Sequence, residues 1–237
     1  TELSDVEGFV GNFKTTLNTD GSEETLEHGI AVISTGANEF KPDEYLYGQD
    51  PRVITHLELD QKFIANDPAF KDMKSAVFIQ CVGSRSVQPG HLSYCSKICC
   101  ANTVKNTLLL KEYFPELDIY VFHNGIRTNG NRQERMFLEA RKRGVVFINA
   151  FPDVMEGHVL SFSDPILNQD GLMEKPFDMV VLATGVVPTA QEMRRILGVP
   201  LGKRGFIKED NQLSPTSTPT TGIYFAGAVG APADIKQ

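Results

Sequence analysis

Residues 75–110 read SAVFIQ-CVGSRSVQPGHLSYCSKICC-ANTVKNTLLL, and this stretch decides the fold. Its first six residues form an apolar, partly β-branched run that predicts a buried strand. After a cysteine-rich loop, residues 99–114 have helical spacing, with Val104, Leu108 and Leu109 on one face. A strand, a loop and a helix in this order are typical of a parallel α/β unit.

The segments that follow continue this alternation. Strands are predicted at residues 118–122, 145–148 and 178–185, and a helix at residues 132–143. Residues 151–177 alternate and turn, which indicates a small antiparallel excursion. We therefore expect a Rossmann-like domain over residues 67–188.

The residues on either side predict a second unit, which this domain interrupts. Residues 8–17 alternate as a half-buried strand does, and Asn18-Thr19-Asp20-Gly21 has the chemistry of a tight turn. Further strands are expected at residues 29–36 and 222–227, and helices at residues 55–64 and 190–197. The predicted domains are therefore residues 1–66, 67–188 and 189–237.

Composition excludes several classes of protein. The net charge of −7 argues against a nucleic-acid-binding protein, which needs a basic surface. No apolar run approaches the roughly 18–20 residues of a membrane-spanning helix, and we expect no signal peptide because residues 1–5 are polar and acidic. We expect a cytoplasmic protein, where thiols stay reduced and clustered cysteines favour a metal over disulfides. The abrupt start and end lead us to expect a fragment of a longer protein.

All four cysteines, Cys81, Cys95, Cys99 and Cys100, have the spacing C-x13-C-x3-C-C. Four thiolates suit a [4Fe–4S] cluster or a structural zinc ion. Zinc sites usually combine two separate C-x2–4-C turns, which the adjacent Cys99-Cys100 pair fits poorly. An iron–sulfur cluster is therefore preferred, and zinc or four metal-free buried thiols are the alternatives.

The predicted helix suggests how these cysteines are arranged. If the helix begins near Cys95, then Cys95 and Cys99 share a face, while Cys81 arrives from the end of the preceding strand. The free amides at a helix N-terminus would lower the thiol pKa values and favour an anionic cluster. Arg85 and Lys97 add positive charge nearby.

The loop at residues 81–85 stands where a dinucleotide-binding unit carries G-x-G-x-x-G, and that fingerprint is missing. The next predicted strand ends in His123-Asn124, without the acidic residue that holds a ribose hydroxyl. We therefore do not expect NAD(P) to bind there. The sequence also lacks a C-x-x-C redox pair, so an ordinary pyridine-nucleotide disulfide reductase is not favoured.

Two predicted strands end in Thr-Gly, one in Ser34-Thr35-Gly36 and one in Ala183-Thr184-Gly185. A third small-residue strand, GIYFAG, follows at residues 222–227. Small residues at strand ends let a large planar cofactor approach the backbone closely. The repeated pattern therefore indicates cofactor contacts.

Together these features resemble the flavoprotein disulfide reductases, such as the thioredoxin reductases. The resemblance is closer to the family of heterodisulfide reductase A subunits and their relatives, which include flavoprotein subunits of quinone-interacting oxidoreductases. It covers almost the whole chain, and the cysteine motif is its most specific part. It is carried by residues 35–37, 41–48, 80–85, 94–100, 126–128 and 226–228, with Pro232, Asp234 and Ile235.

The resemblance implies an α/β fold in which a thioredoxin-reductase-like, Rossmann-like domain is inserted in a partial FAD-binding domain. It implies that the four cysteines hold a [4Fe–4S] cluster near FAD. Thr35, Gly36, Ala37, Gly227 and Ala228 fall where the family contacts FAD, with Ala228 in place of the Asp of the wider reductase family. The G-x-G-x-x-G that would hold the FAD pyrophosphate is not in this sequence. We therefore expect FAD in the full-length protein and little or none on the fragment.

The expected function is that of an oxidoreductase subunit that relays electrons between FAD and the cluster toward other subunits of a redox complex. No catalytic acid–base residue is expected in this segment, and the fragment alone should be inactive. The alternative is an interaction module, stapled by zinc or a silent cluster, without redox activity. His91 could be a metal ligand or could contact one, although an exposed loop histidine is simpler. Arg127 could face a flavin or a partner, although a surface ion pair is the default.

Overall fold

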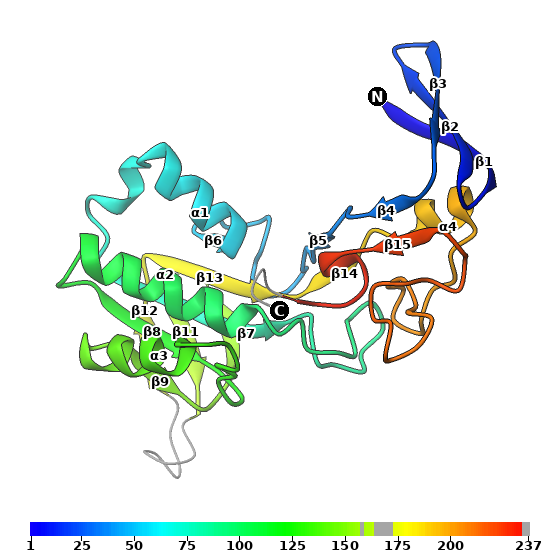
Figure 1. The fold of residues 1–237 in the computed structure, drawn as a ribbon. Helices are drawn as coiled ribbons and strands as arrows, with labels where there is room; N and C mark the ends of the chain where they lie inside the picture. Colours follow the sequence, from blue (N-terminus) through cyan, green and yellow to red (C-terminus); the bar gives the residue numbers. More distant parts are fainter. Residues whose placement is uncertain (157–158, 164–172, 234–237) are drawn as a thin grey trace. The chain divides into compact units, whose positions relative to one another are not determined.

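The computed structural model describes residues 1–156, 159–163 and 173–233 (Figure 1). Its internal contacts divide the chain into two compact units. The central unit is Glu39–Gly185, and the flanking unit combines Thr1–Asn38 with Val186–Gln237. One unit is thus inserted into the sequence of the other.

A five-stranded parallel sheet runs through the central unit in the order β6-β13-β7-β8-β9. Its strands are β6 (Val53–Thr55), β7 (Ser75–Val82), β8 (Asp118–Phe122), β9 (Val146–Ile148) and β13 (Met179–Thr184). The helices of this unit are α1 (His56–Ala65), α2 (Cys99–Tyr113) and α3 (Gln133–Lys142), with the short 3-10 helix η1 (Pro68–Phe70). Because α2 leads from β7 to β8 and α3 from β8 to β9, the Rossmann-like fold class is confirmed.

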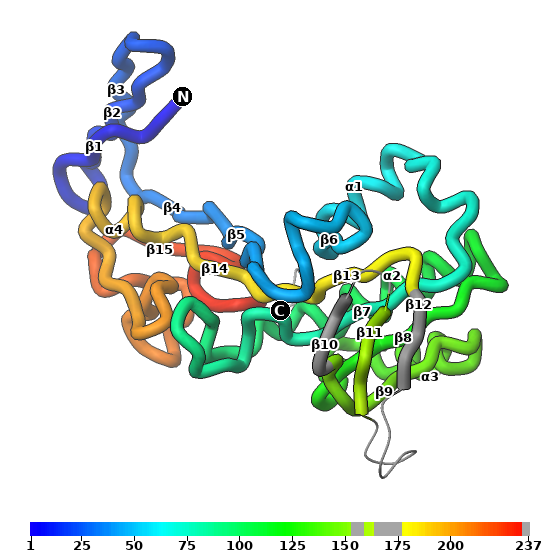
Figure 2. The backbone as a smooth tube through the Cα atoms, turned by 180° about the vertical axis from the view of Figure 1, so that it is seen from behind, coloured from blue at the N-terminus to red at the C-terminus, as the bar shows by residue number. Residues whose placement is uncertain are grey.

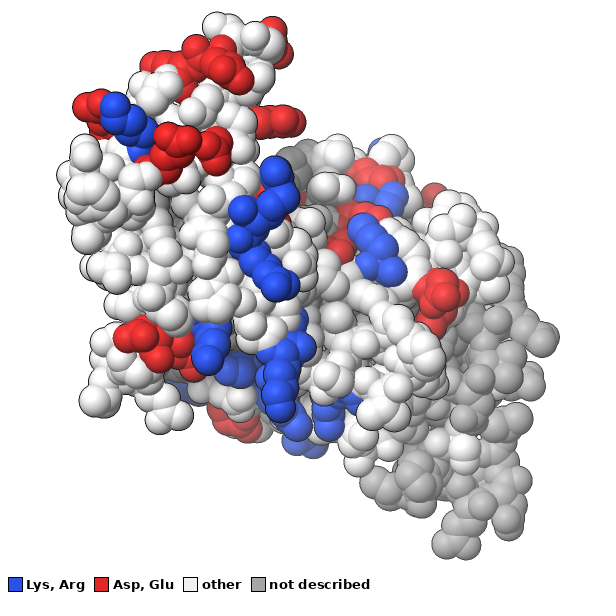
Figure 3. Space-filling model, turned by 90° about the vertical axis from the view of Figure 1, so that its right-hand side faces the viewer, with Lys and Arg blue, Asp and Glu red and all other residues white. Residues whose placement is uncertain are grey.

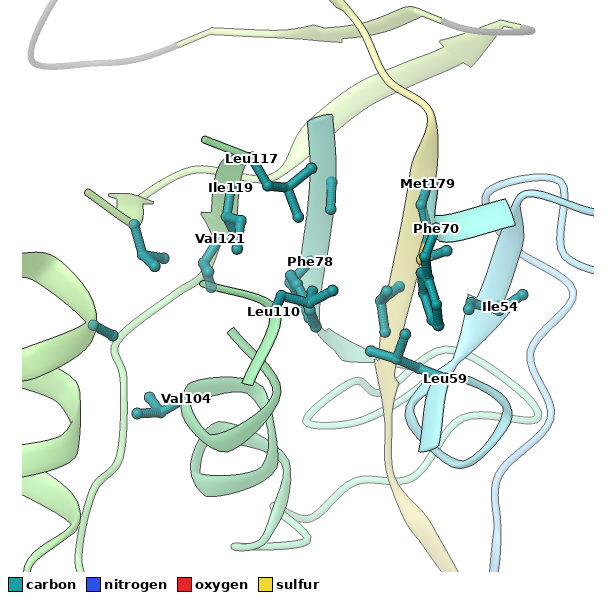
Figure 4. Close-up of a cluster of buried hydrophobic side chains, with 14 residues drawn as sticks. Ile54, Leu59, Phe70, Phe78, Val104, Leu110, Leu117, Ile119, Val121 and Met179 are labelled. Atoms are coloured by element: carbon teal, nitrogen blue, oxygen red, sulfur yellow. The ribbon is translucent and has the colours of Figure 1, made fainter. Parts of the chain in front are cut away.

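Alternate residues of β7 supply the two buried faces of this sheet. Phe78 belongs to a cluster with Leu110 of α2 (Figure 4). Ile79 belongs to a second cluster with Leu160, which lies in a small antiparallel sheet. Figure 2 shows the backbone of the strand that contains Leu160, labelled β11. That sheet consists of β10 (Pro152–Glu156), β11 (Val159–Phe162) and β12 (Met173–Pro176). It confirms the predicted excursion, of which residues 157–158 and 164–172 lie outside the described residues.

Local chemistry fixes the start of α1 and the segment before it. Thr55 and Glu58 form a capping box, in which each side chain satisfies a backbone N–H of the other residue. Glu58 Oε1 also accepts from Tyr47 Oη at 2.6 Å and from Lys41 Nζ at 3.0 Å. Residues 41–48, part of the family resemblance, are thus held against the first turn of α1.

The flanking unit contains an antiparallel sheet, two short strand pairs and one α-helix. The sheet is formed by β1 (Glu2–Phe9), β2 (Asn12–Thr19) and β3 (Ser22–His28). The strand pairs are β4 (Ala31–Ile33) with β15 (Ile223–Phe225), and β5 (Ala37–Glu39) with β14 (Val186–Pro188). The helices are α4 (Gln191–Leu197) and the 3-10 helix η2 (Gly227–Val229). Phe13, Ile33, Ile223 and Phe225 lie in its buried core.

The prediction of one strand over residues 8–17 is wrong, because a tight turn at Val10-Gly11 separates β1 from β2. Gly11 has a φ of +87°, which only glycine adopts easily. The predicted turn at residues 18–21 is confirmed. Asp20 and Gly21 have φ values of +52° and +87°, as a two-residue hairpin turn requires.

The antiparallel sheet of the flanking unit carries most of the net negative charge. Residues 1–28 contain seven acidic residues and one basic residue, Lys14. Figure 3 shows acidic side chains crowded on this sheet. The rest of the chain is therefore nearly balanced in charge. Among the residues that the structure describes, no helix is long and apolar enough to cross a membrane.

Contacts group residues 39–66 with the central unit, whereas the sequence places the first boundary after residue 66. The reason is that β6 joins the parallel sheet as an edge strand, with Val53 opposite Val180 of β13. The second junction lies at Gly185, three residues before the predicted one.

Candidate metal centre

The four cysteines reach one region of the central unit from different elements. Cys81 lies in β7, Cys95 lies in the loop, and Cys99 and Cys100 begin α2. All four line one small pocket, of about 10 Å³. Its full lining is Cys81, Ser84, Arg85, Cys95, Ser96, Lys97, Cys99, Cys100 and Arg127.

The condition that the helix begins near Cys95 is not met, because α2 begins at Cys99, where the predicted helix over residues 99–114 also begins. Lys97 has a φ of +62°, a left-handed conformation that cannot continue into a right-handed helix. Asn102 N then donates to Ile98 O at 3.0 Å and closes the first turn. Cys95 and Cys99 therefore do not share a helix face.

Strained backbone is concentrated around these cysteines. Cys81, Arg85 and Lys97 have φ values of +59°, +57° and +62°. Such conformations cost about 1–3 kcal/mol each in non-glycine residues and are retained where surrounding structure enforces them. Here Leu92 N donates to Gly83 O at 2.9 Å and Arg85 N to Tyr94 O at 3.2 Å, so the loop is closed on itself. An observed cluster of strain of this kind points to a functional site.

Hydrogen-bond donors surround three of the sulfur atoms. Arg85 Nη1 lies 3.7 Å from Cys81 Sγ, and Lys97 N donates to Cys95 Sγ at 3.4 Å. The backbone of Arg127 donates to Cys100. Arg127 therefore lies at the cysteine pocket, where the sequence favoured only a surface ion pair. Donors directed at sulfur stabilise a thiolate and tune a bound metal.

Burial raises the pKa of the Cys99 thiol, and the neighbouring cysteines raise it further. Burial also raises the pKa of Cys100, against the smaller lowering effect of the Arg127 backbone. The expected lowering by the helix N-terminus is therefore wrong for these two thiols, since desolvation outweighs it. Cys99 Sγ accordingly donates to Thr184 O at 3.1 Å. Metal binding at these thiols must release protons.

Gly185 lets the cysteine loop approach the end of β13. A Cβ at this position would lie 2.2 Å from Ser84 Oγ, 2.7 Å from Leu92 Cδ1 and 2.9 Å from Ser96 Oγ. The small residue that ends Ala183-Thr184-Gly185 therefore makes room for the cysteine loop. The sequence analysis missed this role because it attributed the ending to contacts with a cofactor. A glycine after a buried strand was the available signal.

The four thiols are candidate donors for an iron–sulfur cluster or for a single metal ion. Within residues 1–156, 159–163 and 173–233, no three His, Cys, Asp or Glu side chains are close enough to hold one metal ion. The four thiols nevertheless surround one pocket. A cluster contributes its own sulfide and binds each cysteine through a different iron, so its ligands lie farther apart than those of one tetrahedral ion.

A larger pocket of about 350 Å³ lies beside the cysteine pocket, at the carboxyl ends of β7 and β8. It shares Cys81, Ser84 and Arg85 with the cysteine pocket. His91 lines this larger pocket, with Nε2 3.8 Å from Glu44 Oε2, and does not line the cysteine pocket. His91 therefore shares the larger pocket with Cys81 and does not line the pocket that all four cysteines share.

The residues expected to contact FAD lie together in the flanking unit. β4 and β15 are parallel, with Ile33 opposite Phe225, so Thr35 and Gly36 follow one strand and Gly227 and Ala228 follow its neighbour. Thr189 Oγ1 donates to Gly36 O at 2.9 Å and lies 3.3 Å from Thr35 Oγ1. Ala37 begins β5 directly after them. The carboxyl ends of adjacent parallel strands are the usual ligand position in α/β folds. Asp234 and Ile235 lie outside the described residues.

Two curated relatives illustrate what the sequence is similar to. The chain is 33% identical over 233 residues to the A subunit of the H(2):CoB-CoM heterodisulfide,ferredoxin reductase of Methanothermobacter marburgensis. It is 33% identical over 234 residues to the iron-sulfur A subunit of the CoB--CoM heterodisulfide reductase of Methanocaldococcus jannaschii. Each alignment covers 90% of this chain and 35% of the relative. The chain thus spans about a third of the length of these relatives. No family model matches it.

Solved structures share the fold. Thioredoxin reductase from T. acidophilum has a TM-score of 0.60 at 17% identity, over 100% of this chain and 67% of that chain. An NAD-dependent persulfide reductase from A. fulgidus has a TM-score of 0.57 at 19% identity, over 95% of this chain and 37% of that chain. These identities show the fold alone, whereas the curated relatives show the family. Over the nine tenths of its length that align, the chain belongs to the family of heterodisulfide reductase A subunits.

Proposed function

We propose that this chain is the part of an oxidoreductase subunit that holds a [4Fe–4S] cluster through Cys81, Cys95, Cys99 and Cys100. The observation that carries the proposal is the gathering of four thiols around one pocket, with donors at three of the sulfurs. When bound, a cluster of this kind takes up and releases single electrons. The name of the M. jannaschii relative, an iron-sulfur subunit, supports the proposal.

The residues of the chain would hold, orient and shield this group. β7 and α2 supply three ligands from regular elements, and the strained loop supplies Cys95. The guanidinium of Arg85 and the backbone N–H groups of Lys97 and Arg127 would stabilise negative charge on sulfur. The burial of Cys99 and Cys100 would limit the access of water.

FAD is the proposed second cofactor of the complete subunit. Thr35, Gly36, Ala37, Gly227 and Ala228 would line its site in the flanking unit. Cβ atoms added at Gly36 and Gly227 would meet nothing within 4 Å, which is consistent with room for a planar group. Because this sequence has no G-x-G-x-x-G to hold the FAD pyrophosphate, we propose that the chain alone binds FAD weakly or not at all.

Electrons would pass between FAD and the cluster toward other subunits of a cytoplasmic redox complex. Both relatives are named as one subunit of a reductase, which supports a multi-subunit assembly. The chain alone would hold a link in this path and would not turn over a substrate. Accordingly, the test concerns the cluster and not an enzymatic rate.

The experiment is anaerobic reconstitution of the full chain with ferrous iron and sulfide. We expect about four irons and four sulfides per chain and an EPR signal on reduction. Cys99→Ser should lose most of the bound iron. Ser93→Ala is the matched control, because Ser93 is exposed in the same loop and does not line the pocket.

Two results would count against the proposal. A colourless chain that binds zinc stoichiometrically and gives no EPR signal would favour the interaction module without redox activity. Iron binding that Cys99→Ser leaves unchanged would contradict the ligand set.

A further inference from the structure

Four buried polar side chains lie close to the cysteines, where α1 and α2 pack on β7. His56, Gln80, Thr103 and Asn106 are 6%, 1%, 0% and 0% exposed. Polar groups in an apolar core destabilise the fold unless they are hydrogen-bonded. Their presence at this position therefore needs a physical reason.

Thr103 is the centre of this group. Its Oγ1 lies 2.9 Å from His56 Nε2 and accepts a hydrogen bond from the side-chain amide of Gln80. The amide nitrogen of Asn106 donates to His56 Nδ1 at 3.1 Å. Nε2 of His56 then carries the proton and donates to Thr103.

These residues connect the elements that present the cysteines. Thr103 follows Cys99 by four residues and Cys100 by three in α2, so it lies on their side of the helix. Gln80 directly precedes Cys81 in β7. The Thr103 hydroxyl thus links two elements. It connects the end of β7, which carries Cys81, to the start of α2, which carries Cys99 and Cys100.

The sheet itself gives this strand end little support. The ladder between β7 and β8 ends at Ile79, opposite Phe122. The ladder between β7 and β13 is irregular after Ile79 and resumes at Val82, opposite Thr184. Residues 80–81 therefore lie outside the regular pairing on both sides. The hydrogen bond from the Gln80 side chain to Thr103 ties this irregular stretch to α2.

We propose that Thr103 is a positioning residue of the cysteine site, and this inference rests on the proposed function. Its hydroxyl sets the spacing between the end of β7 and the first turn of α2. Cys81 is thereby held at the separation from Cys99 and Cys100 that a cluster needs. A residue that only filled the core would not need the hydroxyl, since valine has the same shape without it.

The test compares Thr103→Val with Thr107→Val in the full chain, reconstituted anaerobically with ferrous iron and sulfide. Thr107 is the matched control, because it is 0% exposed in the same helix and donates to Val104 O at 3.0 Å. Thr103→Ser keeps the hydroxyl, and Gln80→Met removes the same bond from the strand side. Iron content, the rate of cluster loss to a chelator, and the EPR spectrum and midpoint potential are measured.

Thr103→Val and Gln80→Met should lose the cluster to the chelator about tenfold faster, which corresponds to about 1.4 kcal/mol. They should also alter the EPR spectrum or the midpoint potential, which a loss of core packing alone would not change. Thr103→Ser and Thr107→Val should stay within about twofold of the parent. Far-UV circular dichroism of each variant checks that the fold is kept.

The outcomes distinguish this inference from the function on which it rests. Parent-like chelation and EPR in Thr103→Val or Gln80→Met overturn the positioning role alone. An equal loss in Thr103→Ser also overturns it, because the hydroxyl would then be irrelevant. A parent chain that assembles no cluster overturns the proposed function together with the inference.

Discussion

The two Thr-Gly strand ends look alike in the sequence and differ in the space around them. At Gly185 of the central unit, an added Cβ would lie 2.2 Å from Ser84 Oγ. At Gly36 of the flanking unit, an added Cβ would meet nothing within 4 Å, and a φ of +70° is what favours glycine. The same two letters thus serve a close contact in one unit and a backbone conformation beside open space in the other.

This difference separates two reasons for a small residue at a strand end. Thr184 O accepts from Cys99 Sγ, so the end of β13 supports the cysteine loop within the chain itself. Gly36 lies near Gly227, whose φ is +74° and whose added Cβ would also meet nothing. Of these two strand ends, only the one at Gly36, near Gly227, leaves room for a planar cofactor. The Thr-Gly motif alone does not tell a strand end of this kind from one that contacts the loop.

Alanine substitutions at the two glycines should have very different effects, and Gly185→Ala should have the greatest effect of the changes considered. Gly185→Ala forces a Cβ against Ser84 and should lower the free energy of unfolding by about 3 kcal/mol, the upper end for overpacking. The displaced loop should also lose most of its reconstituted iron. Gly36→Ala should cost only about 1 kcal/mol, for its positive φ, and keep the iron. Urea midpoints and iron analysis check this, and equal losses from both variants would contradict it.

Regular elements with clear periodicity were predictable from the sequence. The strand at residues 118–122 has the expected bounds, and the helix expected at residues 99–114 is found at Cys99–Tyr113. The arrangement of Cys95 was not predictable, because it depends on the left-handed conformation of Lys97. Nothing in the letters SYCSKICC distinguishes that conformation from a helical one.

The candidate site was predictable only where its residues are close in sequence. The four cysteines fall within twenty positions, so their spacing indicated a common site. The bond between His56 and Thr103 joins residues 47 positions apart, and the one between Gln80 and Thr103 joins residues 23 apart. Such pairs follow from the packing of α1, α2 and β7, which periodicity does not specify.

The stability of the central unit should depend on pH, because its core contains a buried histidine, His56. Burial lowers the pKa of His56 to about 4, while the nearby charges of Asp60 and Lys105 act in opposite directions. The folded state thus keeps the imidazole neutral, and the unfolded state protonates it below about pH 6.5. Stability from this group is complete above pH 6.5 and lost as the pH falls toward 4. By pH 5 the loss should reach about 2 kcal/mol.

The measurement is urea denaturation of the iron-free chain between pH 7.5 and pH 5, with about 0.5-unit steps. His56→Gln removes the titrating group and should flatten the decline over this interval, although its stability at pH 7.5 is lower. Iron-free chains are required because acid releases metal from thiolates. Parallel curves for parent and variant would show that His56 does not couple folding to pH.

A smaller effect is expected from the charge of Arg85, which should change the midpoint potential of the cluster without a change in packing. Arg85 belongs to the loop that contacts Gly185, and its Nη1 lies 3.7 Å from Cys81 Sγ and 3.0 Å from Asn124 O. Arg85→Gln removes a positive charge that favours the reduced cluster, so the midpoint potential of the cluster should fall by on the order of 60 mV.

Lys97→Gln is the matched control, because Lys97 contacts Cys95 through its backbone N–H, which the variant keeps. It should shift the potential by less than half as much, since water screens its exposed side chain. EPR-monitored redox titration measures both, and a rise with Arg85→Gln or equal shifts in the two variants would show that the guanidinium does not act on this sulfur.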